Sequence, residues 1–191
     1  MNNPIKKQMR YSIEEILFYL PLGNSFLVEN IPNHLAGYFV QELYETLKDK
    51  QSICTYLPVA VNLEEIEPAI FFPTVTEQIA NVVSSKYPHL QSMFVEGSLA
   101  IDIIDFVYVI KRLLEEGISK KVFNEKPVIV VFILYNADVI DRFGQKFKED
   151  LNDLLKENIF SAVIVAKHIS RKWESQKPHW LEPFLNIWFK K

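Results

Sequence analysis

The chain has 191 residues, which suits one domain of ordinary size, and 49% of them are apolar. Its net charge of −3 argues against a protein that coats nucleic acid with its whole surface, although a local basic loop is compatible with it. No stretch approaches the roughly 20 apolar residues of a membrane helix, and no apolar signal core follows the N-terminal charges, so we expect a cytoplasmic protein.

The first part of the chain predicts alternating helices and strands. Ser12-Ile13-Glu14-Glu15 has the form of a capping box and predicts a short helix that begins there. The apolar run at 25–28 predicts a strand, and apolar spacing of three and four residues from Phe39 to Leu47 predicts a helix. The continuous run from Ile53 to Val61 predicts a strand covered on both faces, and the lone Cys54 within it predicts a buried thiol.

The second part continues this alternation. A helix is predicted at 77–84 and a short strand at 92–95, and the apolar period from Leu99 predicts a helix that Gly117 closes as a C-terminal cap. Further strands are predicted at 128–134, 160–166 and 183–189, with a helix at 143–155 between the first two. This order predicts an α/β fold, a three-layer sandwich with a mostly parallel central sheet, in one domain over residues 1–191.

Residues 23–39, GNSFLVENIPNHLAGYF, resemble the start of RecA/KaiC-type ATPases, in which a strand, a phosphate loop and a helix follow one another. A working loop has the form G-x-x-x-x-G-K-[ST], because its amides and lysine bind phosphates and its hydroxyl binds magnesium. In register, Asn30, Leu35, Ala36 and Gly37 replace the two glycines, the lysine and the hydroxyl residue. The resemblance therefore implies a RecA/KaiC-like core without a functional phosphate loop, with no nucleotide cofactor and no ATPase activity.

The acidic residues of that family are also replaced. No carboxylate ends the second strand, and Glu64 and Glu65 are interpreted as acids in the first turn of the next helix. Ile133 or Tyr135, depending on the register, takes the place of the magnesium-linked aspartate. Asp138 is either a displaced substitute for that aspartate or a solvent-facing loop acid, and its place past the apolar run favours the loop acid.

The same segment also resembles the Walker B region of AAA+ proteins, whose aspartate and glutamate would become Tyr135 and Asn136. An AAA+ module adds a helical lid after the core, whereas only about 25 residues follow Ala166 and end in a predicted strand. We therefore prefer the RecA/KaiC assignment.

The segment after Ala166 interleaves basic and aromatic residues. In RecA-type recombinases a loop at this point contacts single-stranded DNA, and cations with indole rings suit that task. The candidate DNA-binding residues are Lys167, Arg171, Lys172, Trp173, Lys177 and Trp180. The alternative is a solvated loop whose tryptophans pack against the sheet. His168 and His179 have no carboxylate or cysteine at ligand spacing, so we expect no metal site.

Two functions follow from these patterns. The first is a non-catalytic accessory subunit that pairs with itself or with an active RecA-fold ATPase, in DNA recombination or repair with contact to single-stranded DNA. The alternative is a regulatory or scaffold protein that binds a protein partner and not DNA, favoured by the acidic net charge and by aromatics such as Tyr38. No acid, base and nucleophile set supports an active enzyme.

Overall fold

The computed structural model describes residues 4–49, 53–88, 90, 100, 102–123, 126–166 and 184–188. Their strands form one sheet in the order β2-β3-β4-β1-β5, and all four neighbouring pairs are parallel. The strands are β1 (Ser25–Glu29), β2 (Thr55–Asn62), β3 (Val128–Tyr135), β4 (Phe160–Val165) and β5 (Phe184–Trp188).

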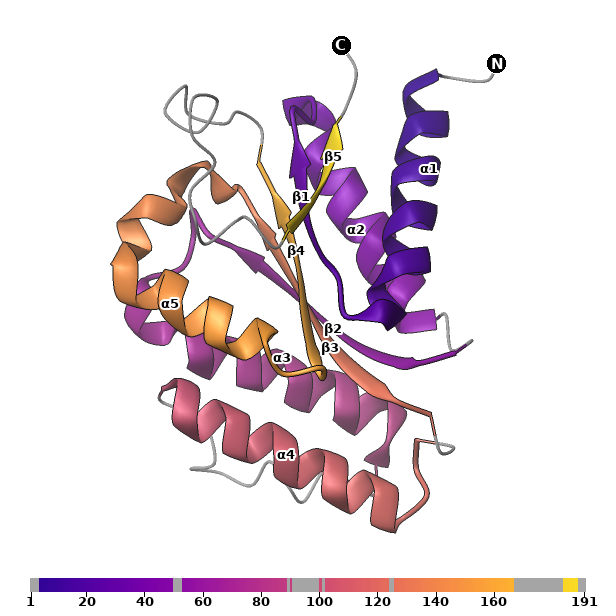
Figure 1. Ribbon diagram of the computed structural model, residues 1–191, viewed down its shortest axis with the longest axis vertical. Coiled ribbons are helices and arrows are strands. Elements are labelled where there is room, and N and C mark those ends of the chain that lie inside the picture. The colour runs from indigo at the N-terminus through magenta and orange to yellow at the C-terminus, as the bar shows by residue number, and fades with distance from the viewer. Residues whose placement is uncertain are drawn as a thin grey trace.

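Helices cover both faces of this sheet (Figure 1). One face packs against α1 (Pro4–Tyr19) and α2 (Asn33–Asp49), and the other against α3 (Phe71–Lys86), α4 (Ile103–Ser119) and α5 (Gly144–Leu155). The predicted α/β three-layer sandwich with a parallel central sheet is therefore confirmed.

The continuous apolar run at 128–134 forms β3, an interior strand of the sheet. Its side chains alternate between the two faces, so Phe132 packs in the core under α3, α4 and α5, and Ile133 in the core under α1 and α2. Both residues are fully buried. A strand covered on both faces needs apolar residues at every position, which is the pattern that the sequence carries here.

A layer of phenylalanine rings joins two of the strands to α4. The ring centroids of Phe106, Phe132 and Phe160 lie 5.8 to 5.9 Å from one another, and all three side chains are fully buried or nearly so. Rings at this separation stabilise each other beyond the area that they bury. This layer is a principal support of the fold.

The first helix begins earlier than the sequence predicted. Helix α1 starts at Pro4, so Ser12 lies in its middle and is 5% exposed. The predicted capping box at Ser12 is therefore wrong. The helix continues on both sides of Ser12 because an apolar stripe beside this residue is buried against the core. The stripe consists of Met9, Ile13, Ile16, Leu17 and Leu20.

The predicted C-terminal cap at Gly117 is also wrong. Helix α4 continues past it to Ser119, and the chain turns at Lys121, which has a φ of 55°. The Val122 amide then donates to the Gly117 carbonyl oxygen over 2.8 Å, which caps the helix. Gly117 lies inside the helix, where the ring of Phe123 packs against it. A Cβ at this position would lie 1.9 Å from Cε2 of that ring, so the contact with Phe123 explains the glycine.

The acidic pair at 64–65 does not start a helix. Residues 63–65 form a turn, in which the Glu64 amide donates to Oδ1 of Asn62 over 3.1 Å, and α3 begins only at Phe71 after a short 3-10 helix, η2 (Pro68–Ile70). The interpretation of Glu64 and Glu65 as first-turn acids is therefore wrong. The predicted strand at 92–95 lies outside the described residues.

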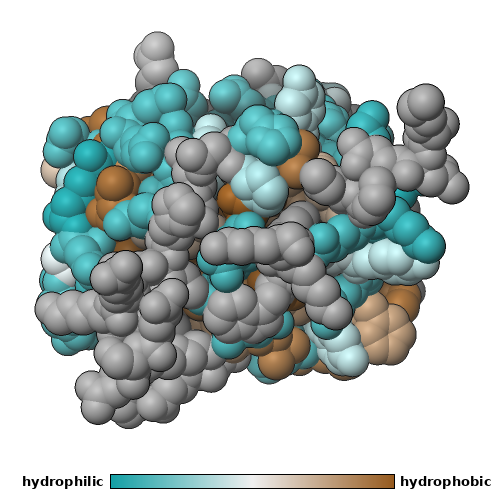
Figure 2. All heavy atoms as spheres, turned by 90° about the horizontal axis from the view of Figure 1, so that it is seen from above, coloured by the Kyte–Doolittle hydropathy of each residue, from teal (hydrophilic) through white to brown (hydrophobic). Residues whose placement is uncertain are grey.

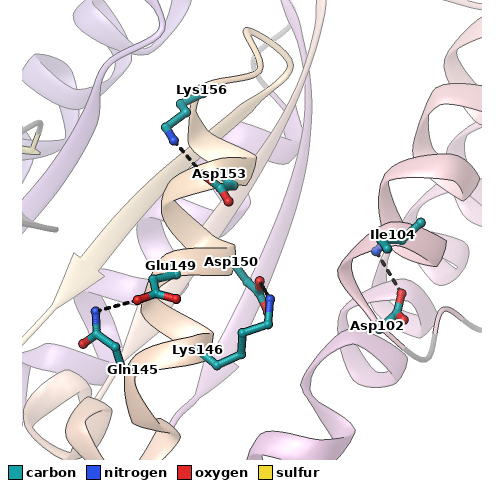
Figure 3. A network of polar contacts seen from close by, with 8 residues as sticks. All are labelled: Asp102, Ile104, Gln145, Lys146, Glu149, Asp150, Asp153 and Lys156. Atoms are coloured by element: carbon teal, nitrogen blue, oxygen red, sulfur yellow. Dashed lines mark hydrogen bonds and ion pairs between the residues drawn. The ribbon is translucent and has the colours of Figure 1, made fainter.

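The described residues on one face of the molecule are mainly hydrophilic (Figure 2). Figure 2 shows hydrophobic side chains in separate groups among hydrophilic ones on the face seen from above. In Figure 3, Asp102 caps α4 by accepting from the Ile104 amide over 2.9 Å. Side-chain pairs three and four residues apart follow α5: Lys146 with Asp150, Gln145 with Glu149, and Lys156 with Asp153. These contacts stabilise helices and define no site.

No helix in the described part of the chain is long and apolar enough to cross a membrane.

Candidate functional site

The connection between β1 and α2 occupies the place where a phosphate loop would lie. It consists of Asn30, Ile31 and Pro32, and Asn30 turns the chain with a φ of 58°. Ile31 is 1% exposed and packs in the core. The amides of Leu35 and Ala36 both donate to the Pro32 carbonyl oxygen, over 2.8 and 3.2 Å. The connection is thus shorter than the phosphate-loop motif, its central side chain points inward, and two amides are used within the first helical turn.

The residues assigned to the nucleotide site do not gather around one space. Leu35 and Ala36 lie in the first turn of α2 and pack toward the core, where Ala36 is 4% exposed. Gly37 follows on the exposed side of α2. The one lysine of α2 is Lys48, in its last turn and far from the connection. Of the four assigned positions, Gly37 lines the pocket described below and the other three do not.

Two asparagines tie the carboxyl ends of β2 and β3 together. Nδ2 of Asn136 donates to Oδ1 of Asn62 over 2.7 Å, and Asn136 has a φ of 54°. Tyr135, the last residue of β3, is half-buried. Burial raises the pKa of its phenol, and the nearby Glu65 carboxylate raises it further. Neutral amide and phenol groups therefore stand where the resemblance would place acids.

A pocket of about 420 Å³ opens between α2 and the β2 edge of the sheet. Its lining combines carboxamides, phenols and small apolar side chains, and holds no lysine, arginine, histidine or acid. The lining residues are Gly37, Val40, Gln41 and Tyr44 of α2, Ala60 of β2, Gln78 and Asn81 of α3, and Tyr135 of β3. The arrangement can hydrogen-bond and pack, and its lining holds no carboxylate, imidazole, amine or thiol.

Gln78 closes the edge of the sheet beside this pocket. Strand β2 is an edge strand, and the Thr55 and Leu63 amides donate toward β3, so the alternating Ala60 amide faces outward. Nε2 of Gln78 donates to the Ala60 carbonyl oxygen over 2.9 Å, and its Oε1 accepts from the Ala60 amide over 3.0 Å. Pro58, on the same outward side, has no amide hydrogen. The carboxamide thus takes the place of a neighbouring strand and fixes one wall of the pocket.

The candidate DNA-binding loop is outside the described residues. Strand β4 ends at Val165, and the Ala166 amide donates to the Val28 carbonyl oxygen over 3.0 Å, before residues 167–183. Lys167, Arg171, Lys172, Trp173, Lys177 and Trp180 all fall in that segment, as do His168 and His179. The predicted last strand is confirmed by β5, which pairs with β1.

Two smaller predictions concern reactive groups. Cys54 is free and 3% exposed, and burial raises the pKa of its thiol, which confirms the predicted buried thiol. Asp138 is exposed, as predicted, within a 3-10 helix, η4 (Ala137–Phe143), that follows β3. Among the described residues, no three histidine, cysteine or acidic side chains gather as a metal site would require.

Several solved structures resemble this chain. It aligns over its full length with 93% of a chain in a structure of Drosophila ORC bound to DNA, with a TM-score of 0.54 and 17% identity. It covers 55% of a chain in a structure of Drosophila ORC bound to AT-rich DNA and Cdc6 (TM-score 0.53, 16% identity). It covers 44% of the Aeropyrum pernix ORC1 protein in complex with DNA (TM-score 0.56, 13% identity). The chain thus spans about half the length of these last two. No family model and no curated protein matches the sequence.

These likenesses concern the fold alone, because none exceeds 17% identity. They support the α/β fold of P-loop ATPases, which the sequence predicted at this coarser level. They give no support to the finer RecA/KaiC assignment, because the similar structures are described as ORC proteins. The loss of ATP binding stays a prediction.

Proposed function

We propose that this chain is a non-catalytic accessory subunit with a P-loop ATPase fold, which associates with itself or with an active ATPase subunit of that fold. The observation that carries the proposal is the three-residue connection after β1, with Ile31 packed in the core. ATP phosphates bind where free amides and a cation converge. Here Pro32 already accepts from two amides, and Ala36 takes the place of the lysine.

The outer face of α1 is a candidate surface for association. Its inner stripe is buried, yet three large side chains on the outer face are exposed. Tyr11 and Phe18 of α1 are 59% and 69% exposed, and Leu22, in the 3-10 helix η1 (Leu20–Leu22) that follows, is 70% exposed. The rings of Phe18 and Tyr19 also contact each other edge to face, with centroids 4.9 Å apart. Clustered exposed apolar side chains are typical of protein interaction sites.

Contact with single-stranded DNA is the second element of the proposal. The similar structures are described as ORC proteins with bound DNA, which supports a test of DNA binding in this chain. The basic and aromatic residues between 167 and 180 are the candidates for that contact. The alternative function, a scaffold that binds protein and not DNA, is favoured by the net charge of −3.

Sedimentation velocity and DNA titration test the accessory role together. We expect concentration-dependent association that a Phe18→Ser/Leu22→Ser double variant reduces, while an Ile104→Ser/Tyr108→Ser variant of equally exposed residues on α4 leaves it unchanged. If Arg171, Lys172 and Lys177 neutralise phosphates, the affinity for single strands should fall with salt with a slope near about −2, from roughly −0.7 per phosphate.

Each of these two experiments has an outcome that would count against the accessory-subunit proposal. Association without any binding of single-stranded DNA at low salt would favour the scaffold function. A chain that stays monomeric, together with a protein partner that has no ATPase fold, would contradict the accessory-subunit proposal.

A further inference from the structure

The pocket between α2 and the β2 edge has no assigned ligand. We propose that it binds an uncharged, planar heterocycle whose edge carries both hydrogen-bond donors and acceptors, the chemical class of the nucleobases. The inference rests on the proposed function, because it takes this end of the sheet to have no phosphate chemistry. Its evidence is the charge, the size and the polar groups of the lining.

The charge of the lining disfavours an anionic ligand. The lining holds no acidic or basic side chain, and burial and the nearby Glu65 carboxylate both raise the pKa of the Tyr135 phenol. An anion that left water for this pocket would lose hydration without gaining a counter-charge, and the Glu65 carboxylate would repel it. A neutral ligand has no such cost.

The size and apolar surface of the pocket suit a single flat ring system. A volume of about 420 Å³ lies toward the lower end of small-molecule sites, which run from roughly 300 to 1,000 Å³. Val40 and Ala60 supply aliphatic surface, and Tyr44 and Tyr135 supply two aromatic rings from different elements. Aromatic side chains favour contact with another planar ring.

The polar groups of the lining can recognise the edge of such a ring. The carboxamides of Gln41 and Asn81 each offer donors and an acceptor, and a phenol offers both as well. The Gln78 carboxamide already bonds both backbone groups of Ala60, so it fixes the wall instead of adapting to a ligand. A nucleobase edge, with adjacent donors and acceptors, complements side chains of this kind.

Gly37 provides a way to close the pocket without disturbing the fold. It lies on an exposed part of α2, and an added Cβ would meet no atom within 4 Å. A Gly37→Leu substitution should therefore place a side chain in the opening, while Gly37→Ala adds only a methyl group. Both should raise the melting temperature, because alanine and leucine are better helix formers than glycine.

The test is an NMR titration of the full chain with adenosine, guanosine, cytidine and uridine. We expect at least one nucleoside to cause saturable shifts of the side-chain amide signals of Gln41, Gln78 and Asn81. Its 5′-monophosphate should bind about tenfold more weakly or worse, a loss of roughly 1.4 kcal/mol. Gly37→Leu should abolish the shifts and Gly37→Ala should retain them, with Asn81→Ala as a second, weakening variant.

The contrary outcomes separate this inference from the proposed function. Saturable binding by none of the four nucleosides, or equal binding by Gly37→Leu and Gly37→Ala, overturns the pocket proposal and leaves the accessory role untouched. Tighter binding of the monophosphate than of the nucleoside overturns both, because it requires an anion site at this end of the sheet.

Discussion

Replacing Phe132 by alanine should lower the free energy of unfolding by about 3 to 5 kcal/mol, the range for deletion of a buried aromatic ring. Phe132 is fully buried on the central part of β3, and its ring lies 5.9 Å from both Phe106 and Phe160. Its loss would leave a cavity between α4 and two strands and would remove two ring contacts. Because domains of this size are stable by roughly 5 to 15 kcal/mol, the change should be large in a urea unfolding curve.

The exposed Tyr108 is the control for this change. Its side chain is 62% exposed on α4, outside the surface proposed for association, so Tyr108→Ala removes an aromatic ring from water rather than from the core. We expect its effect on the unfolding free energy to stay within about 0.5 kcal/mol. Similar effects at the two positions would mean that the phenylalanine layer does not support the fold as described.

A Gly117→Ala substitution should also destabilise the chain, by about 1 to 3 kcal/mol, the usual cost of overpacking. The added Cβ would lie 1.9 Å from Cε2 of Phe123, and that ring is 2% exposed and packs edge to face on Tyr87, with centroids 5.1 Å apart. The ring or the helix must therefore move. The helix propensity of alanine opposes this loss by at most about 1 kcal/mol.

Gly37→Ala is the same chemical change at a helical position with free space. No atom lies within 4 Å of the added Cβ there, so we expect a gain of about 0.5 to 1 kcal/mol from the helix propensity alone. Urea unfolding of both variants measures the difference. A loss at Gly37, or a gain at Gly117, would contradict the packing of α2 or of α4 against Phe123.

The order of elements could be predicted from the sequence because each buried strand is a continuous apolar run. The runs at 128–134 and 160–166 became β3 and β4 with nearly the same bounds. Local end signals were less reliable. Serine and glycine are typical of helix ends. Burial of the apolar stripe of α1 instead determined the environment of Ser12, and contact with Phe123 determined that of Gly117.

The pocket was not predictable in the same way. Its lining comes from α2, β2, α3 and β3, and neutral amides such as Gln41 and Asn81 form no sequence motif. For Tyr135 and Gly37 the sequence offers only their places at motif positions of the P-loop ATPases. The RecA/KaiC assignment depended on the number of residues after Ala166, and the parallel sheet itself does not distinguish the two classes.

We propose that this α/β fold acts without binding nucleotide phosphates. It is tested most directly by isothermal titration calorimetry of the full chain with ATP and magnesium. The short connection with Ile31 in the core, the two amides bonded to Pro32 and the lack of a lysine at Ala36 together predict no saturable heat. Saturable binding with a Kd in the micromolar range would contradict the account.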